Sequence, residues 1–212
     1  MLIALVYGLI FVGVTATLYQ LYAVNYAINF DNAQKLSSNN RAKLERLNAA
    51  AGQGVRGDDA HAETFDHAVE ATLGEHFDKT LAREAIESDD ENAARALLRR
   101  HNDLHFDTRI SARVGPLGRV HLPRRDWRAL FITLVIINSL IAQFLGGMSI
   151  YTLLYPVQTP ALSWFNEPAI LMGLIFLLLP VNHLLGQLDF YLNDLYRIGR
   201  LAREKRAATR YA

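Results

Sequence analysis

Three stretches of this chain carry no charged side chain, and their lengths limit what the chain can fold into. Residues 1–30 and 129–166 contain no Asp, Glu, Lys or Arg, and neither do residues 168–188, which follow the single acid Glu167. A helix rises 1.5 Å per residue, so about 20 apolar residues cross the hydrocarbon core of a bilayer. The sequence therefore predicts three transmembrane helices, over residues 1–30, 128–155 and 168–190.

The Lys and Arg residues near the ends of these spans predict the orientation. Basic residues follow the first span, precede the second and follow the third, whereas residues 149–167 contain no Lys or Arg. Short basic flanks stay in the cytoplasm. We therefore expect the N-terminus and an outer connector, residues 156–167, to lie outside. A cytoplasmic domain, residues 31–127, and a basic cytoplasmic tail, residues 191–212, lie inside.

Two further observations bear on the cellular location. The chain has no cysteine, as expected of a protein whose polar part faces a reducing cytoplasm. Residues 1–30 could be a cleaved secretory signal, but they lack a basic n-region and an obvious small-x-small cleavage site before a polar mature start. We expect a retained signal anchor and a multi-pass protein of the bacterial inner membrane.

Each predicted span contains a pair of small residues four positions apart. Such pairs allow two helix backbones to approach closely, although they also arise by chance in helices rich in Ala and Gly. The predicted orientation places all three pairs in the outer half of the membrane. The candidate helix-packing residues are Ala4, Gly8, Ala142, Gly146, Ala169 and Gly173.

Uncharged polar residues form a second group within the spans. Asn138 and Gln143 lie in the second span, and Asn182 and Gln187 lie in the third, after Pro180. An amide that faces lipid has no hydrogen-bond partner, so these side chains should face a neighbouring helix or water. Pro180 removes a backbone donor and should kink the helix, which frees a carbonyl for one of these side chains or for a partner.

His183 is the only ionisable residue well inside a predicted span. An intramembrane histidine is a candidate ligand of a haem or chlorophyll, or a proton-handling group. The simpler interpretation is a hydrogen-bonded histidine near the inner headgroups. A bis-histidine haem needs a second intramembrane His, which the sequence lacks. We therefore expect no cofactor and keep His183 as the one candidate cofactor-binding residue.

The cytoplasmic domain is predicted to be mostly helical, with a small hairpin at its end. Apolar residues recur every fourth position from Phe65 to Leu81, which predicts one long helix over about residues 59–87. Alternating residues around a Gly-Pro turn predict a β-hairpin over about residues 110–122. The other expected helices cover about residues 33–51 and 89–101. The fold class is thus an all-α membrane protein with one small hairpin.

A cluster of arginines surrounds this hairpin and the start of the second span. Arginines at a membrane surface attract anionic headgroups, each by about 1 kcal/mol. Nucleic-acid binding is the rival interpretation, but the cluster matches no nucleic-acid-binding motif and is tied to a membrane span. We expect anionic lipids and no nucleic acid as ligands of Arg119, Arg124, Arg125 and Arg128.

Two patterns that could support other chemistry are weak. Residues 52–57 match G-x-G-x-x-G, but no strand precedes them, so we expect a loop without a nucleotide. Acidic residues and a histidine share one face of the helix around Asp66 and could bind a metal or be solvated. No catalytic motif of the common hydrolase, metalloprotease or nucleotide-binding kinds occurs. We therefore expect no enzyme activity.

The order of spans and domains resembles the proton-channel subunits of the energy-transducing TonB and Tol systems. In that family the third helix carries a Thr, then Gly-Leu and a Pro near its inner half. Gly173, Leu174 and Pro180 match the later parts of this pattern, whereas Met172 stands where the Thr would be. The resemblance implies an ion-conducting oligomer.

The preferred hypothesis is a noncatalytic accessory subunit of a multi-subunit inner-membrane complex. Its spans would pack against other membrane subunits and its cytoplasmic domain would dock partners, because a domain with so thin a core gains burial from a partner. The first alternative is the proton-channel subunit. The second is an electron-transfer or light-harvesting subunit that uses His183.

Overall fold

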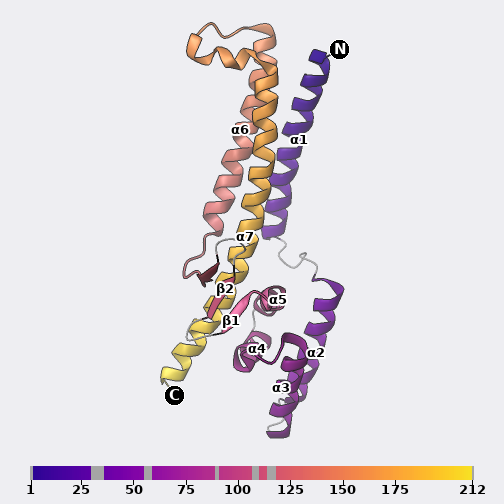
Figure 1. Cartoon of the computed structure of the whole chain (residues 1–212), viewed down its shortest axis with the longest axis vertical. Coiled ribbons are helices and arrows are strands. Elements are labelled where there is room, and N and C mark those ends of the chain that lie inside the picture. The colour runs from indigo at the N-terminus through magenta and orange to yellow at the C-terminus, as the bar shows by residue number, and fades with distance from the viewer. Residues whose placement is uncertain are drawn as a thin grey trace. The chain divides into compact units, whose positions relative to one another are not determined.

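The computed structural model describes residues 2–29, 36–54, 59–88, 91–106, 110–113 and 118–211 (Figure 1). The chain divides into two compact units. An apolar unit combines Met1–Asp31 with Trp127–Phe190, and a charged unit combines Asn32–Asp126 with Tyr191–Ala212. Each unit is thus built from two separate segments of the chain.

The apolar unit is formed by three helices that lie side by side (Figure 1). They are α1 (Leu2–Asn29), α6 (Arg128–Leu154) and the first part of α7 (Pro168–Tyr211). A 3₁₀ helix, Pro160–Asn166, lies in the segment that connects α6 to α7. All three helices contain windows with a mean hydropathy of 2.1 and are long enough to cross a membrane. The prediction of three such helices in a mostly helical chain is confirmed.

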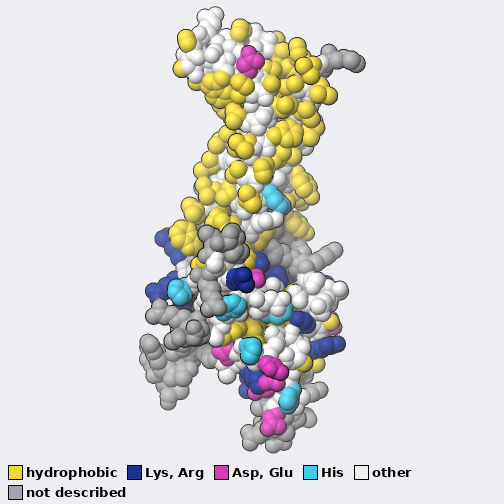
Figure 2. Space-filling view, in the orientation of Figure 1, with side chains coloured by type: hydrophobic (Ala, Val, Ile, Leu, Met, Phe, Trp, Pro, Cys, Tyr) yellow, Lys and Arg dark blue, Asp and Glu magenta, His cyan; other side chains and the backbone are white. Residues whose placement is uncertain are grey.

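Little of the apolar unit is buried inside the chain itself. Its core consists of Ile10, Leu145, Leu171 and Ile175. Large apolar side chains cover the rest of its surface, including Phe11, which is 72% exposed. Figure 2 shows this surface as almost continuous hydrophobic side chains over the three helices. A soluble monomer rarely exposes so large an apolar area, whereas lipid or other membrane helices can cover it.

The charged unit contains four short helices, a small sheet and the last part of α7. The helices are α2 (Ser38–Gly54), α3 (Asp59–Leu73), α4 (Lys79–Glu87) and α5 (Glu91–Arg100). The strands are β1 (Leu104–Phe106), β2 (Ile110–Arg113) and β3 (Arg119–His121), joined in this order in an antiparallel sheet. Lys, Arg, Asp, Glu and His side chains gather over this unit in Figure 2.

The single helix predicted over about residues 59–87 is in fact two helices, α3 and α4. Gly74 adopts a φ of 103°, which a residue with a side chain rarely adopts, and this conformation ends α3. Asp78 then caps α4, because its side chain accepts hydrogen bonds from the backbone amides of Thr80 and Leu81. The four-residue spacing of apolar side chains continues through this break, because Phe77, which lies between the two helices, is buried in the same core as Leu73.

The predicted two-stranded hairpin is part of a three-stranded sheet. β2 pairs with β3 as expected, with Ser111 opposite His121, and β1 adds a strand on the other side of β2, with Leu104 opposite Ala112. The run Leu104–Phe106 was too short to show a strand pattern. Of the predicted turn, residues 115–118, the first three lie outside the described residues, and Gly118 has a φ of 73°.

The predicted basic tail, residues 191–212, is the continuation of α7 rather than a separate segment. Leu195 and Ile198 are fully buried, and Leu201 is nearly so. They belong to the core of the charged unit together with residues of the four short helices, such as Leu47 and Phe65. Their spacing of three residues places them on one face of a helix. The sequence pattern did not predict this apolar face because basic residues lie between its apolar residues.

Candidate functional site

A polar cluster, defined by Gln20, Asn138, Ser139 and Asn182, joins the three helices of the apolar unit. Asn182 Nδ2 donates to Ser139 Oγ at 3.1 Å, which links α7 to α6. Asn138 and Gln20 donate to backbone carbonyls of α7 at 3.0 and 3.3 Å. An amide without water must find such partners inside the protein. The cluster therefore supplies interhelical hydrogen bonds within one chain.

The carbonyls that accept these bonds lie just before Pro180, inside α7. Asn138 binds the carbonyl of Leu178 and Gln20 binds the carbonyl of Leu179. The proline itself leaves the carbonyl of Phe176 without its usual helical donor, four residues earlier. Side chains of α1 and α6 thus contact α7 near Pro180. They bind the carbonyls of Leu178 and Leu179, which follow the freed carbonyl of Phe176 by two and three residues.

Close helix contacts inside the apolar unit depend on two glycines. A Cβ atom at Gly146 would lie 2.6 Å from Val14 Cγ2, and one at Gly13 would lie 2.7 Å from Ile175 Cγ2. Ala142, one turn before Gly146, is fully buried. The pair of the second span therefore lies at a contact with α1. Gly13 lies four residues before Thr17, a small-residue pair that the sequence analysis did not single out.

The other two predicted pairs lie on the outside of the unit. Ala4, Gly8, Ala169 and Gly173 are exposed. Among the described residues, no heavy atom beyond the helix itself lies within 4 Å of a Cβ atom built at Gly8 or Gly173. Gly8 and Gly173 thus make no close helix contact with the described residues, and all four exposed residues remain available to another molecule.

Six exposed residues of α7 form a line that we call the α7 seam: Ala169, Gly173, Phe176, Pro180, His183 and Gln187. They are spaced alternately by four and three residues. This alternation keeps residues on one side of a helix and is the spacing by which two helices pack along a common line. Small side chains occupy its first part, and polar side chains occupy its last part.

His183 and Gln187 contact each other one helical turn apart. The two Nε2 atoms are 2.7 Å apart, and both side chains are exposed. An amide nitrogen can only donate, so the imidazole accepts through Nε2 and carries its proton on Nδ1. Among the described residues, neither the Nδ1 donor nor the amide oxygen has a further hydrogen-bond partner. Gln143, the remaining residue of the polar group predicted in the spans, is half-buried.

An ion pair that the sequence did not reveal lies close to Gln187 along the chain, at Asp189. Arg128 Nε is 3.8 Å from Asp189 Oδ2, and the two side chains are only 15% and 2% exposed. Arg128 begins α6 and Asp189 lies in α7, so the pair joins these two helices. Arg128 was expected at lipid headgroups, whereas the structure places its side chain inside the unit, where a buried charge needs a partner.

The other predicted headgroup residues lie in the charged unit. Arg124 and Arg125 are exposed. Arg119 pairs in β3 with Arg113, and its side chain lies outside the described residues. Arg124 also lines a cavity of about 520 Å³ together with residues of α7. The two neighbouring arginines therefore differ: Arg124 faces a cavity, and Arg125 does not line it.

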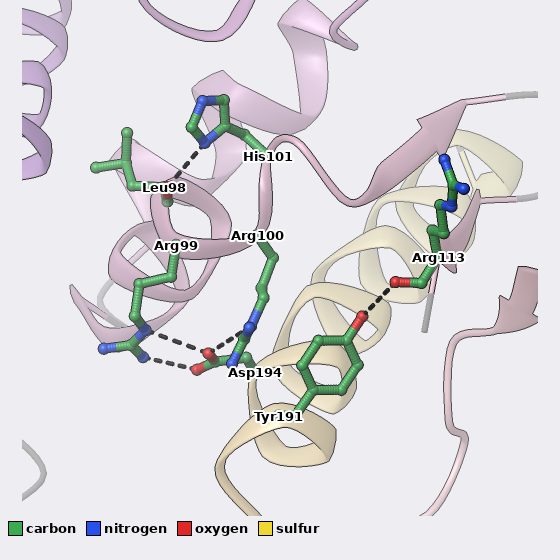
Figure 3. A network of polar contacts seen from close by, with 7 residues as sticks. All are labelled: Leu98, Arg99, Arg100, His101, Arg113, Tyr191 and Asp194. Carbon is green, nitrogen blue, oxygen red and sulfur yellow. Dashed lines mark hydrogen bonds and ion pairs between the residues drawn. The ribbon is translucent and has the colours of Figure 1, made fainter. Parts of the chain in front are cut away.

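Asp194 fixes α7 to α5 within the charged unit (Figure 3). Its carboxylate oxygens lie 2.6 Å from Arg99 Nη2 and 3.1 Å from Arg100 Nε, and Asp194 is only 3% exposed. The guanidinium of Arg100 also lies 4.3 Å from the ring centre of Tyr191, whose hydroxyl donates to the carbonyl of Arg113. This network is a structural clamp of α5, β2 and α7.

The acidic face predicted as a possible metal site is used by ion pairs. Lys79 Nζ lies 2.5 Å from Glu70 Oε1, and Arg83 lies 3.5 Å from Asp66. The Lys79 ammonium holds the pKa of Glu70 below its usual value. In the described part of the chain, no three His, Cys, Asp or Glu side chains group in a way that could hold a metal ion.

His101 lies in the charged unit beside a cavity of about 430 Å³. Its Nδ1 lies 2.8 Å from the carbonyl of Leu98, and its Nε2 lies 3.2 Å from Lys43 Nζ. The imidazole thus donates to the carbonyl and accepts from the ammonium. Burial lowers the pKa of His101, and the nearby Lys43 charge lowers it further, against the opposing effect of the Leu98 carbonyl.

Comparison of the chain with protein-family models, with curated proteins and with solved structures finds no match. The arrangement of side chains is therefore the basis for the function. The features that bear on it are the α7 seam on the apolar unit and the Arg124 cavity of the charged unit.

Proposed function

We propose that the protein is a noncatalytic subunit of a multi-subunit complex in the bacterial inner membrane. The three apolar helices cross the bilayer, with the N-terminus and the α6–α7 connector outside and the charged unit in the cytoplasm. The orientation rests on the basic residues of the flanks and their absence from residues 149–167. The α7 seam binds a transmembrane helix of another subunit.

The α7 seam is the observation that carries this proposal. Its six residues are exposed and follow the four-and-three spacing of a helix-packing line. Ala169 and Gly173 allow a second backbone to approach, as small residues do between membrane helices. Van der Waals contact with a helix fills the space beside a glycine better than mobile lipid chains do.

The polar end of the seam supports a protein rather than lipid on this face. Exposed His183 and Gln187 interrupt a surface that is mostly apolar, with Leu184 62% exposed beside them. Polar side chains that face hydrocarbon are costly, and a partner helix can supply their remaining hydrogen bonds. The amide nitrogens of the polar cluster inside the unit already donate within the chain, whereas Gln20 Oε1 and Asn182 Oδ1 are buried without a hydrogen-bond partner among the described residues.

A channel-forming oligomer of the TonB and Tol kind is the second candidate. The seam favours it as well, because one copy could present its seam to the next copy around a ring. The polar groups inside the apolar unit argue against an ion path through a single copy, since they bond to one another and to α7 carbonyls. The channel hypothesis therefore requires a path between copies.

Co-purification of the full chain with its partners tests the proposal. Gly173→Leu should lower the yield of partner protein about tenfold, because the added side chain holds the partner backbone away. Gly147→Leu is the matched control. Gly147 is an exposed glycine of α6 that, among the described residues, also has no heavy atom within 4 Å of a built Cβ, but it lies outside the seam.

The composition of the purified complex separates the two candidates. Unlike chains bound to one copy of this protein support the accessory subunit. A ring of identical copies whose assembly fails in Gly173→Leu supports the channel and contradicts the accessory role. Equal yields from wild type, Gly173→Leu and Gly147→Leu would show that the seam contacts no protein.

A further inference from the structure

A cavity of about 520 Å³ in the charged unit is lined by basic and apolar side chains. β2 and the segment after β3 form one side, and the last part of α7 forms the other. Its size is that of sites that take small ligands. The lining residues are Ile110, His121, Leu122, Arg124, Gly199, Ala202 and Arg203.

The charges around this cavity are of one sign. Arg124 and Arg203 line it, and His121 adds a group that can donate a hydrogen bond or accept a proton. Among the described residues, no Asp or Glu lines the cavity, and no ion pair joins either arginine to a carboxylate. Two guanidinium groups at one cavity match an anion with several oxygens, because each can donate two parallel hydrogen bonds.

Arg203 is held in place by groups that do not neutralise it. Its Nη1 donates to the carbonyl of Pro123 at 3.4 Å, and its guanidinium carbon lies 5.9 Å from the ring centre of Tyr196. Neither contact supplies a negative charge. An arginine positioned in this way loses less side-chain freedom when an anion binds.

Gly199 provides the space for this arrangement. A Cβ atom at this position would lie 3.2 Å from Arg203 Nη1 and 3.2 Å from Leu122 Cβ. A larger side chain would therefore push Arg203 away from Leu122 and fill part of the cavity. The cavity thus depends on the glycine at position 199, whereas a surface that is only basic would not depend on it.

We propose that this cavity binds a phosphate group, with Arg124 and Arg203 as its two main donors. The phosphate can come from the headgroup of an anionic phospholipid or from a soluble phosphate ester. Arg124 precedes Arg128, the first residue of α6, by four positions, so it lies within about 14 Å of the start of that helix. If α6 crosses the membrane, a lipid headgroup is within reach, and this choice of source rests on the proposed function.

Native mass spectrometry of the full chain in a neutral detergent tests the site. One phosphatidylglycerol or phosphatidic acid should bind per chain, whereas phosphatidylcholine should bind at least tenfold more weakly. Arg124→Gln and Arg203→Gln should each lower the occupancy about tenfold, since each removes a charged hydrogen-bond donor. Arg125→Gln removes the same charge from the neighbouring residue and should change the occupancy less than twofold.

Gly199→Val tests the cavity without a change of charge. It should lower lipid binding as strongly as Arg203→Gln, and hydrogen exchange over α7 checks that the variant remains folded. Inorganic phosphate and glycerol phosphate form the other arm of the experiment. If they bind with the same dependence on Arg124 while the lipids do not, the phosphate site stands and its source is soluble.

Two results would overturn the proposal: no phosphate compound binds, or Arg125→Gln weakens binding as much as Arg124→Gln. The second result would indicate general attraction to a basic surface. Partner co-purification should be unchanged in Arg124→Gln, so failure of the phosphate site and failure of the α7 seam give different patterns.

Discussion

The two units of this protein handle their buried polar groups in different ways. The apolar unit joins its helices through neutral amides and a hydroxyl, with Asn182 bonded to Ser139 as an example. The charged unit joins α5 to α7 through a carboxylate, Asp194, between two arginines. One helix, α7, contributes to both arrangements along its length.

The difference follows from the surroundings that each unit requires. Burying an ionised group in hydrocarbon costs more free energy than burying a neutral amide, so amides are better suited to join helices there. Ion pairs near a water-exposed surface retain part of their hydration, and Arg99 and Arg100 are each about a quarter exposed. The Arg128–Asp189 pair is the exception in the apolar unit, and it lies at the first residue of α6. The comparison therefore predicts where each unit is sensitive.

The largest effect is expected at Asp194. Asp194→Asn leaves two guanidinium groups without a buried counter-charge and should destabilise the charged unit by about 3 kcal/mol. Hydrogen exchange measured by mass spectrometry should show faster exchange in α5 and residues 191–204 of α7, with α1 and α6 unchanged. The unit would not depend on the clamp if exchange in α5 stayed at the wild-type rate.

The next effect concerns helix contact in the apolar unit. Gly146→Val places methyl groups where Val14 already lies and should cost about 2 kcal/mol. The thermal midpoint of the protein in detergent measures the loss. Gly147→Val, at the exposed neighbouring position, is the control and should leave the midpoint within error. Equal midpoints for the two variants would contradict the α1–α6 contact.

A smaller effect is expected from the polar cluster. Asn138→Leu removes the hydrogen bond to the carbonyl of Leu178 and should cost about 0.6 kcal/mol, the average for interhelical bonds in membranes. The same change at exposed Thr133, which bonds only within its own helix, should have less effect. A thermal midpoint lower for Thr133→Leu than for Asn138→Leu would indicate that the cluster does not join the helices.

The smallest effect is a dependence on pH in the charged unit. The pKa of His101 is lowered in the folded protein, so the unfolded chain binds a proton more readily. Stability should therefore fall as the pH is lowered through about 6.5, the usual value for histidine, and the loss should level off below the folded pKa.

His101→Asn provides the comparison for this pH effect. The variant does not titrate, and its amide can still donate toward the Leu98 carbonyl. The difference in stability between wild type and variant should be larger at pH 7.5 than at pH 5, measured by hydrogen exchange in α5. A difference independent of pH would contradict the neutral state of His101.

Much of the architecture could be predicted from the sequence because the patterns of hydropathy extend over many consecutive residues. The apolar helices were evident from the absence of charge, and β2 and β3 from alternation. The break between α3 and α4 was missed because Gly74 and Asp78 interrupt the backbone without interrupting the apolar spacing. The apolar face of α7 around Ile198 was missed because basic residues alternate with it.

The site was less predictable for a physical reason. The sequence gives residue types, but partners far apart in the chain depend on packing. Asn138 and Asn182 could be named as polar residues in need of partners, whereas Arg128 was expected at lipid headgroups and its partner Asp189 was not singled out. Likewise, the pattern of small residues did not distinguish Gly146, which lies against Val14, from Gly173, which faces outward.

A cross-linking scan of α7 tests the central claim, that its seam contacts another membrane subunit. The chain has no cysteine, so a single cysteine with a photoreactive label gives an unambiguous position. The seam positions Gly173, Phe176, Pro180 and Gln187 are compared with Ile170, Val181 and Leu188, which are similarly exposed but lie off the seam. The account predicts protein cross-links at seam positions and few at the others. Equal cross-linking at both sets, or labelling of lipid alone at every position, would contradict it.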